Sequence, residues 1–566
     1  MKEVFHHIRD TLTKPERKRF FALSLLDIFI NLLDIAFLAL LVWLVQFCVQ
    51  PVHTAKSSFL PSWFLANKPL GPLLIYFFAF IVKNIVGLFI TKAQYALTAK
   101  VAVRLACDNL EAYQQCSYDE YVNTDSSVTT RRVVFQPVEF CQYVLSGAQQ
   151  IITQCVLIVA TISAILIYNS NLFLLLLAVL LPPVVAVFYF MKKRLGAARE
   201  QIKATSEKSL QHLAEAVKGY VESNVYGKNA FFLKRFEHYR RRFSDHLFHS
   251  LFLQNIPGRI METFAVLGLF ALILIANNYK VGGEWFMLTI GAFMAAAYKI
   301  IPGTVKAINL IGQMRSYSQH ETVAKRKNAP KAKERKAPME SIVLNSVSFK
   351  YGNNTVLNNL SLQAERGDMI GISGRSGKGK TTILNLLLGF LSPQEGTVSI
   401  NGELASSEEV RGYWPAIAYV RQQSFIVNDS LVKNIALEEN ANRQKVDDVV
   451  RLSGLDKVIA ADEARQEMMV TENGKNLSGG QVQRIAIARA LYKDADLLLL
   501  DEPFNELDDA SEKQLLVHFK QLAEEGKIVI LITHNKKSLS YCNKIISLDE
   551  EESAHADRSY ARLSGV

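Results

Sequence analysis

The sequence is poor in charge, in cysteine and in repeated or low-complexity segments. Only 21% of its 566 residues are charged, against 49% that are hydrophobic, a balance too apolar for an ordinary pair of soluble domains. The chain is too long for a single core, so we expect at least two domains, one of them lying in lipid. Its six cysteines form no C-x-x-C pair, and we expect them to be unpaired and reduced.

The N-terminus does not have the form of a cleavable signal peptide. It is polar up to Arg19, and the apolar stretch that follows is too long for a signal-peptide core. The net charge of +11 is compatible with nucleic acid or with an anionic membrane face. The apolar runs favour the membrane, where the positive-inside rule explains the excess of lysine and arginine. We therefore expect no nucleic-acid partner.

Six apolar runs in the first part of the chain are long enough to cross a bilayer, which takes about 20 helical residues. They lie near 20–49, 72–92, 144–168, 172–190, 260–277 and 286–306. Only Asn169-Ser170-Asn171 separates the third run from the fourth, which predicts an antiparallel pair of helices. The sequence therefore predicts an all-α membrane domain.

Proline is absent from all but the edges of two long polar segments, 93–143 and 191–259. Both are rich in good helix formers, so we expect the spanning helices to continue out of the membrane through them. The alternative, disordered loops, would carry fewer aromatic and aliphatic residues. The polar segments near 50–71 and 278–285 carry few positive charges, so both termini and both long segments are expected in the cytosol.

A charged, proline-containing stretch, 325–338, has no apolar periodicity and marks a boundary. After it, short aliphatic strands alternate with helical stretches, which predicts an α/β domain. We divide the chain into a membrane domain at 1–324, a basic linker at 325–340 and an α/β domain at 341–566. Strands are expected at Ile342–Val347, Met369–Ile372, Leu497–Leu500 and Ile528–Ile532.

The stretch Gly374–Thr381 fits G-x-x-x-x-G-K-S/T and lies between an expected strand and an expected helix. Its glycines let backbone N–H groups turn toward phosphates, and the helix N-terminus adds the positive end of its dipole. Lys380 is predicted to bind the β- and γ-phosphates, and the Thr381 hydroxyl to bind Mg²⁺. The candidate nucleotide-binding residues here are Gly374, Ser376, Gly377, Gly379, Lys380, Thr381 and Thr382.

Four leucines, Leu497–Leu500, run directly into Asp501 and Glu502. A buried strand that ends in two carboxylates suits a metal and a catalytic base at the carboxyl edge of a parallel sheet. Asp501 is predicted to hold Mg²⁺, and Glu502 to polarise the water that attacks the γ-phosphate. His534 follows the next expected strand, where a histidine is placed to contact the γ-phosphate.

The stretch Leu477-Ser478-Gly479-Gly480-Gln481 identifies a family. Together with the motifs above, it makes the chain resemble exporter-type ABC transporters over nearly its whole length. The implied fold is a six-span helical membrane domain with long cytosolic extensions, followed by an α/β P-loop ATPase domain with a helical subdomain. The implied activity is ATP hydrolysis coupled to transport, with ATP and Mg²⁺ as cofactors.

The resemblance also assigns roles to single residues. Tyr351 matches the aromatic residue that stacks on adenine, Gln422 the glutamine that senses the metal, and Asp508 the aspartate of the dimer-contact loop. Ser478 and the glycines after it open a helix, so they offer N–H groups to a phosphate, which the family places on the opposite subunit. A dimer is therefore implied, and the intact motifs favour a homodimer with two equivalent sites over a heterodimer.

Three features depart from the exporter pattern. Lys378 stands where the phosphate loop usually has a small residue, and Arg421 replaces a common proline before Gln422. The segment after the acidic pair reads Pro503-Phe-Asn-Glu-Leu-Asp508, where exporters usually carry alanine, threonine, serine and alanine. This difference does not affect Asp501 or Glu502, but it leaves the fine chemistry of the dimer-contact loop open.

The membrane half is similar to bacterial lipid-linked oligosaccharide flippases at Pro257–Glu262 and Tyr298–Pro302. Tyr118–Tyr121 and the region from Glu215 to Phe236 take the places of the two coupling segments of exporters, and 53–70 that of a short external helix. The resemblance implies a flippase of the bacterial inner membrane that moves an amphiphile outward. Peptide or drug export and an ATP-gated channel remain alternatives, although an intact Glu502 and His534 count against the channel.

Charged residues inside the spans are costly, so they usually face a cavity or a partner. Asp27, Asn31 and Asp34 recur at i, i+4 and i+7 and share one face of the first span. Counting along the helices places Lys83 and Lys299 at a depth similar to that of Asp27. With Arg259 they predict a surplus of positive charge and an amphiphilic substrate with an anionic head. The alternative is that Asp27 pairs with one lysine and fixes helix packing.

Overall fold

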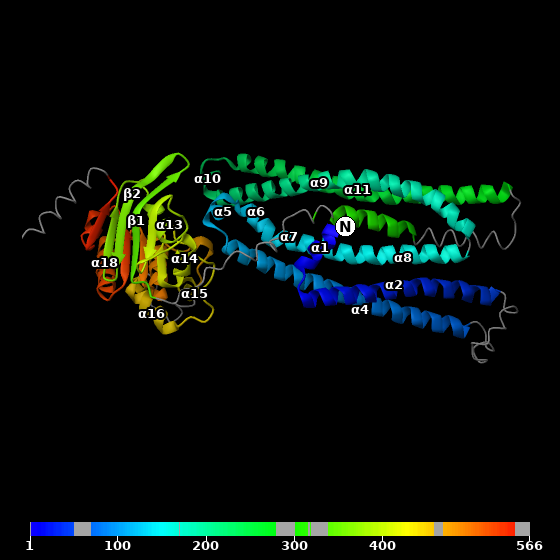
Figure 1. Ribbon diagram of the computed structural model, residues 1–566, viewed down its shortest axis with the longest axis horizontal. Coiled ribbons are helices and arrows are strands. Elements are labelled where there is room, and N and C mark those ends of the chain that lie inside the picture. Colours follow the sequence, from blue (N-terminus) through cyan, green and yellow to red (C-terminus); the bar gives the residue numbers. More distant parts are fainter. Residues whose placement is uncertain are drawn as a thin grey trace, which may run out of the picture. The chain divides into compact units, whose positions relative to one another are not determined.

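The computed structural model describes residues 2–49, 70–168, 170–278, 300–314, 317, 338–457 and 468–549. The chain forms two compact units (Figure 1). The first consists of Met1–Cys116 with Glu120–Ala329, and the second of Ser117–Asp119 with Pro330–Val566. The first is helical, and the second combines helices with sheets.

Long helices make up the first unit. The predicted apolar runs lie in α2, α4, α8, α9, α11 and the helical residues 300–314, while the rest of the sixth run and the expected external helix lie outside the described residues. By length and composition, three described stretches suit a membrane span: Lys14–Phe37, Leu73–Gln114 and Ser126–Ser163. The helices are α1 (Lys2–Thr11), α2 (Lys14–Val49), α4 (Leu70–Gln114), α8 (Ser146–Tyr168), α9 (Ser170–Lys218) and α11 (Asn229–Asn278).

These helices continue well past a bilayer, as the two long polar segments predict. The helix α9 has 49 residues and α11 has 50. At about 1.5 Å per residue each is roughly 70 Å long, more than twice the hydrocarbon thickness of a membrane. The disordered-loop alternative is therefore excluded.

Short helices interrupt the long ones at the two predicted coupling segments. α5 (Tyr118–Asn123) and α10 (Tyr220–Val225) each have six residues. After α5 the chain continues through α6 (Ser126–Thr130), a π-helical turn at Arg131–Phe135, α7 (Gln136–Glu139) and a second π-helical turn at Phe140–Leu145.

An arginine fixes the N-terminal helices to α4. The Arg104 guanidinium donates to both carboxylate oxygens of Glu16, at 2.9 and 3.0 Å, and to the carbonyl of Thr11 at 2.9 Å. The fork geometry of arginine suits this bidentate contact, which ties the start of α2 to α4.

Two sheets organise the second unit. The parallel sheet has the order β6-β7-β8-β3-β9, and the antiparallel sheet the order β2-β1-β4-β5. The four predicted strands are present as β1, β3, β7 and β8. The strands are β1 (Ser341–Tyr351), β2 (Asn354–Glu365), β3 (Met369–Ser373), β4 (Glu395–Ile400), β5 (Glu403–Leu404), β6 (Ile417–Val420), β7 (Leu497–Asp501), β8 (Ile528–Ile532) and β9 (Lys544–Ser547).

The register of the parallel sheet brings three chain segments to the same edge. Ile372 of β3 and Asp501 of β7 both pair with Ile532 of β8. The three strands therefore end at the same level, and the residues that follow them emerge side by side. Carboxyl ends of parallel strands are where ligands bind in open α/β sheets.

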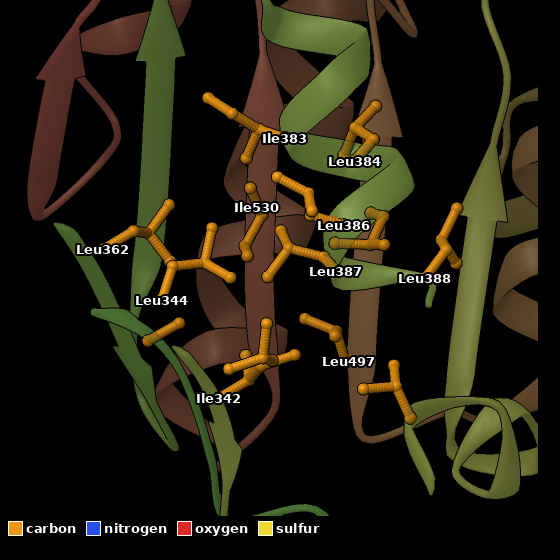
Figure 2. Packing of buried hydrophobic residues seen from close by; sticks show 14 of the residues in the cluster. Ile342, Leu344, Leu362, Ile383, Leu384, Leu386, Leu387, Leu388, Leu497 and Ile530 are labelled. Atoms are coloured by element: carbon orange, nitrogen blue, oxygen red, sulfur yellow. The ribbon is translucent and has the colours of Figure 1, made fainter. Parts of the chain in front are cut away.

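Helices cover the parallel sheet on both faces, which explains the continuous apolar strand Leu497–Leu500. α13 (Lys380–Leu387) packs Ile383 and Leu387 against strand residues such as Ile530 and Leu497 (Figure 2). α18 (Asp509–Glu524) contributes Phe519 to a second cluster with Leu498 and Leu500. All of these side chains are buried.

A helical subdomain carries the predicted signature. α15 (Leu431–Ala436), α16 (Arg443–Leu452) and α17 (Gly479–Lys493) share a buried cluster that includes Ile435, Val446 and Ile485. Two further short helices are α14 (Ser407–Gly412) and α19 (Lys536–Leu539).

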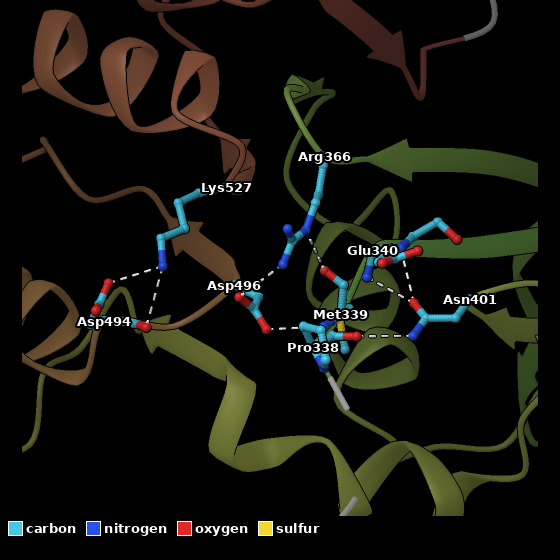
Figure 3. A network of polar contacts seen from close by, with 9 residues as sticks. Pro338, Met339, Glu340, Arg366, Asn401, Asp494, Asp496 and Lys527 are labelled. Atoms are coloured by element: carbon cyan, nitrogen blue, oxygen red, sulfur yellow. Dashed lines mark hydrogen bonds and ion pairs between the residues drawn. The ribbon is translucent and has the colours of Figure 1, made fainter. Parts of the chain in front are cut away.

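Polar contacts fix the point where the chain enters β1 (Figure 3). The backbone N–H of Met339 donates to Asp496 at 2.9 Å, and the Asn401 side chain donates to the carbonyl of Pro338 at 3.0 Å. Met339 is itself fully buried in the core of the α/β unit. Residues 338–340 of the predicted linker are therefore fixed to the α/β unit, and the earlier part of the linker lies outside the described residues.

Candidate active site

The phosphate loop lies between β3 and α13, as the sequence predicts. Gly377 and Gly379 have φ of +84° and +94°, a region that favours glycine. A Cβ at Gly379 would also lie 2.7 Å from Leu357. The Lys380 ammonium donates to the carbonyl of Gly374, at the start of the loop. Ser376 and Thr381 are exposed, whereas Thr382 is buried.

Asp501 is the buried last residue of β7. Burial and the neighbouring Glu502 carboxylate raise the pKa of Asp501 to about 6, against the opposing charges of Lys380 and Arg421. A carboxylate that is both desolvated and beside a like charge is stabilised in its ionised form by a nearby cation. Asp501 therefore sits where a cation is favoured, and Lys380 and Arg421 supply part of that charge.

Side chains from two other segments, and one from the turn that follows Glu502, surround the Glu502 carboxylate. The amides of Gln422 and Asn505 both donate to its Oε2 atom, at 2.9 and 2.7 Å. His534 lies on the other side, with Nδ1 3.6 Å from Oε1. The sequence predicts the proximity of Gln422 and His534 to Glu502 but not that of Asn505.

The backbone of Glu502 adopts a left-handed conformation, with φ of +47°. Such a conformation costs about 1–3 kcal/mol for a non-glycine residue and persists where neighbours hold it in place. The N–H of Glu502 donates to the carbonyl of Ile532 at 3.0 Å. Its carbonyl accepts from the Gln483 side chain at 2.9 Å. Both backbone groups of the strained residue are thus fixed.

Gln483 is a site residue that the sequence reasoning missed. It is buried in α17, two residues after the signature, and its Oε1 atom accepts from the N–H of Glu506 at 3.0 Å. One glutamine therefore joins the signature helix to the segment that follows the acidic pair. Its position just after the signature is the only hint in the sequence that Gln483 belongs to the site. The sequence does not show which strand the signature helix faces.

The signature opens α17 with a capping box. The Ser478 hydroxyl accepts from the N–H of Gln481 at 3.3 Å, and the Gln481 side chain accepts from the N–H of Ser478 at 2.9 Å. A Cβ at Gly480 would lie 2.7 Å from the backbone carbonyl oxygen of Glu506, so only glycine fits at that position. A Cβ at Gly479 would lie 2.8 Å from the Glu506 carboxylate, the end of a side chain that can move. Among the described residues, no hydrogen bond or ion pair joins Ser478 to the phosphate loop of its own chain.

Asp508 caps α18 by accepting from the N–H of Ser511 at 3.1 Å. This hydrogen bonding, with the nearby Arg484, holds the pKa of Asp508 below its usual range. Tyr351, at the end of β1, is 51% exposed, and its ring meets Phe349 edge to face with centroids 5.0 Å apart. One ring face is therefore accessible to a planar ligand.

The departures from the exporter pattern have different structural settings. Phe504 is buried in the core beside Phe519, with ring centroids 6.3 Å apart. Lys378 is exposed on the phosphate loop. Burial raises the pKa of both Asp501 and Tyr419, the latter to about 12, and the charge of Arg421 opposes the rise in each.

The residues at the sheet edge fit Mg²⁺. Asp501, the Thr381 hydroxyl and the Gln422 amide supply the oxygen ligands that this ion prefers. Within the described ranges, no group of three histidine, cysteine, aspartate or glutamate side chains could hold a metal. A nucleotide-bound magnesium needs no such group, because phosphate oxygens and waters supply the remaining ligands.

The polar residues of the first span have partners inside the helical unit. Asp34 forms an ion pair with the buried Lys83. Asp27 accepts from the Thr153 hydroxyl at 2.6 Å, and the Asn31 side chain donates to the carbonyl of Asp27 at 2.8 Å. The expectation of a surplus charge at Lys83 is therefore wrong, because Asp34, about two helical turns after Asp27, pairs with it.

The two remaining cations of the predicted cavity are not brought into this cluster. Arg259 is exposed on α11 and pairs with Glu262 at 3.4 Å. Lys299 lies outside the described residues. The part of the chain that the structure describes therefore assembles only Asp27, Asn31, Asp34 and Lys83 from the predicted set.

Two family models match the sequence. The model of the ABC transporter transmembrane region matches residues 64–295, and that of the ABC transporter matches residues 357–505. Together they take in more than half of the chain. The chain belongs to the ABC transporters. Its α/β unit is thus the nucleotide-binding part of such a protein, and its helical unit the transmembrane part.

Relatives of this ABC transporter include two proteins described as ATP-dependent lipid A-core flippases. The one from Saccharophagus degradans is 36% identical over 234 residues, 41% of this chain and 40% of its own length. The one from Cupriavidus metallidurans is 27% identical over 386 residues, 65% of this chain and 64% of its own length. The chain thus spans less than two thirds of the relatives it matches.

A solved structure of a bacterial Atm1-family ABC exporter with ATP bound has the same fold. The match has a TM-score of 0.77 with 19% identity and covers 97% of this chain and 100% of that one. It confirms the exporter fold predicted from the motifs.

Proposed function

We propose that the chain is one subunit of an ATP-driven exporter that flips an amphiphilic lipid outward across a bacterial inner membrane. The observation that carries the proposal is the convergence of Gln422, Glu502 and His534 beside the phosphate loop, at one edge of the parallel sheet. In this proposal, residues 1–324 form the membrane domain, 325–340 the linker and 341–566 the nucleotide-binding domain. The termini and the nucleotide-binding domain face the cytosol.

Each of the site residues has a separate role in ATP hydrolysis. Lys380 and the N–H groups of the phosphate loop bind the phosphates, and Tyr351 stacks on the adenine. Glu502, oriented by Gln422, takes a proton from the attacking water at its Oε1 atom, beside His534. Asp501, Thr381 and Gln422 hold Mg²⁺, which when bound neutralises charge on the phosphate oxygens.

The signature supports a homodimer. Ser478, Gly479 and Gly480 begin a helix whose N–H groups suit a phosphate, yet within the described residues nothing links them to their own phosphate loop. A second copy of the chain supplies that loop, and Asp508 lies in the segment beside the signature. Each dimer then holds two ATP sites, each with one chain's Lys380 and the other's Ser478.

The cargo we propose is an amphiphilic lipid with an anionic head, which agrees with the flippase names of the relatives. A cavity of about 480 Å³ in the helical unit lies between α11 and residues 300–314. Its polar lining includes Gln254, Glu262, Lys306 and Asn309. Lys306 is exposed there and pairs with no acid among the described residues. Hydroxyl and phosphate groups are the partners such a lining selects, so the anionic head stays part of the proposal.

Transport is tested with the purified protein in liposomes that contain a fluorescent phosphatidylglycerol. We expect ATP and Mg²⁺ to change the fraction of label that a membrane-impermeant quencher reaches, because the lipid crosses the bilayer. Glu502→Gln protein in matched liposomes should show no change. A protein stimulated by cationic drugs or peptides, with no lipid movement, would contradict the lipid cargo but not the exporter.

The dimer is tested by cysteine cross-linking. In a variant without the six native cysteines, Ser376→Cys on one copy and Ser478→Cys on another should cross-link in ATP, because both then face the same nucleotide. The two substitutions are placed on differently tagged copies, so a cross-link between chains is distinguished by its mass. Cross-linking confined to one chain, or none with any nucleotide, would refute the head-to-tail dimer.

A further inference from the structure

Asn505 lies in the segment where this chain departs from the exporter pattern, and it contacts the candidate catalytic base. Its side-chain amide donates to Glu502 Oε2 at 2.7 Å. The Gln422 amide donates to the same oxygen at 2.9 Å. Hydrogen bonds to a charged acceptor are about twice as strong as those between neutral groups, so two such donors fix the rotation of the carboxylate.

The chain around Asn505 holds its amide in place. The preceding Phe504 is buried in the core, and the N–H of Leu507 donates back to the carbonyl of Phe504 at 3.0 Å. The following Glu506 donates its N–H to the buried side chain of Gln483 at 3.0 Å. Asn505 is exposed itself, but both of its neighbours are anchored, so the direction of its side chain is set by the turn.

We propose that Asn505 is a positioning residue for Glu502. With Gln422 it saturates Oε2, which leaves Oε1, the atom beside His534, to accept the proton of the attacking water. The proposal rests on the proposed ATPase function and adds a residue to it. Serine, usual in exporters at this position, has no amide and is shorter, so this chain orients its catalytic base through a contact of its own.

The side chain at position 505 must be long enough to reach Glu502, and it must also carry no negative charge. Aspartate has the shape of asparagine but would place a second carboxylate against Glu502, and like charges this close repel. Alanine removes the donor and adds no charge. Both variants lose the hydrogen bond to Glu502, but Asn505→Asp keeps the shape of the side chain. Comparing them therefore separates the loss of the hydrogen bond from a change in side-chain shape.

The test measures steady-state ATP hydrolysis by the full-length protein in nanodiscs. Asn505→Ala should lower kcat about ten- to a hundredfold, the effect expected for losing one hydrogen bond to a charged group. KM for ATP should change less than twofold, because no described contact joins Asn505 to the phosphate loop. Asn505→Asp should lower kcat further. Asn440→Ala, at an exposed asparagine on the loop after α15, is the matched control and should leave kcat unchanged.

A second measurement separates positioning from a merely structural role. In a Glu502→Gln background, Asn505→Ala should not lower the residual single-turnover rate further, because the contact has already lost its function. An equal loss in both backgrounds, or unchanged kcat in Asn505→Ala and Asn505→Asp, would overturn the inference. A wild-type protein that does not hydrolyse ATP would instead refute the proposed function, so the two failures are distinguishable.

Discussion

Glu502→Gln is expected to lower the rate of ATP hydrolysis by about 10²- to 10⁴-fold, or roughly 3–5 kcal/mol of barrier, while ATP binding persists. The glutamine keeps the size of the side chain and still bonds to Gln422 and Asn505, but it cannot take a proton from water. Lys380 and the phosphate loop are untouched, so the nucleotide still binds. The dimer should therefore be trapped in its closed state.

The measurement is phosphate release at saturating ATP and Mg²⁺, together with ATP affinity by equilibrium binding. Glu524→Gln is the matched control, since Glu524 is exposed at the end of α18, away from the site. Its rate should equal that of the unmodified protein. Turnover by Glu502→Gln at the unmodified rate would mean that another group activates the water.

The sequence predicts most of the nucleotide site because its residues belong to short motifs with fixed local geometry. Leu497–Leu500 needs a buried parallel strand, and Asp501 and Glu502 must then appear at its carboxyl end. The phosphate loop follows from its glycines and the helix that begins at Lys380. These features depend on near neighbours in the chain, so they can be derived without the rest of the fold.

Gln483 and Asn505 could not be found in the same way. Both act through a turn whose path is set by Phe504 in the core and by the left-handed backbone of Glu502. A left-handed conformation at glutamate is not encoded in local preference. It arises from the hydrogen bonds that Ile532 and Gln483 make to its backbone, which are tertiary contacts.

The partner of Lys83 is the clearest error of the sequence reasoning. Counting about 1.5 Å per residue gives the depth of a side chain in the membrane. This count placed Lys83 at the depth of Asp27, which suggested that these two residues could pair. The count says nothing about how a neighbouring helix is rotated or inclined. In the structure the contact between α2 and α4 brings Lys83 to Asp34, while Asp27 meets Thr153 of α8.

Lys83→Met is therefore expected to destabilise the membrane unit by up to about 3–5 kcal/mol, because it leaves the half-buried Asp34 carboxylate without its partner. Lys83 is 8% exposed, and its ammonium also lies 4.8 Å from the centre of the Phe80 ring. The unpaired Asp34 has no other cation among the described residues to replace it. A lower melting temperature in detergent, and less folded protein in the membrane, should follow.

The double variant Lys83→Met with Asp34→Leu decides what the pair does. If it serves packing, removing both charges should restore most of the lost stability, because well-packed apolar residues can replace a buried ion pair. Lys92→Met, at an exposed lysine farther along α4, is the control and should leave stability unchanged. If Lys83 instead binds an anionic head, Lys83→Met should be as stable as the unmodified protein and lose its stimulation by anionic lipid. That outcome would mean that Lys83 binds the substrate and that Asp34 positions the Lys83 side chain.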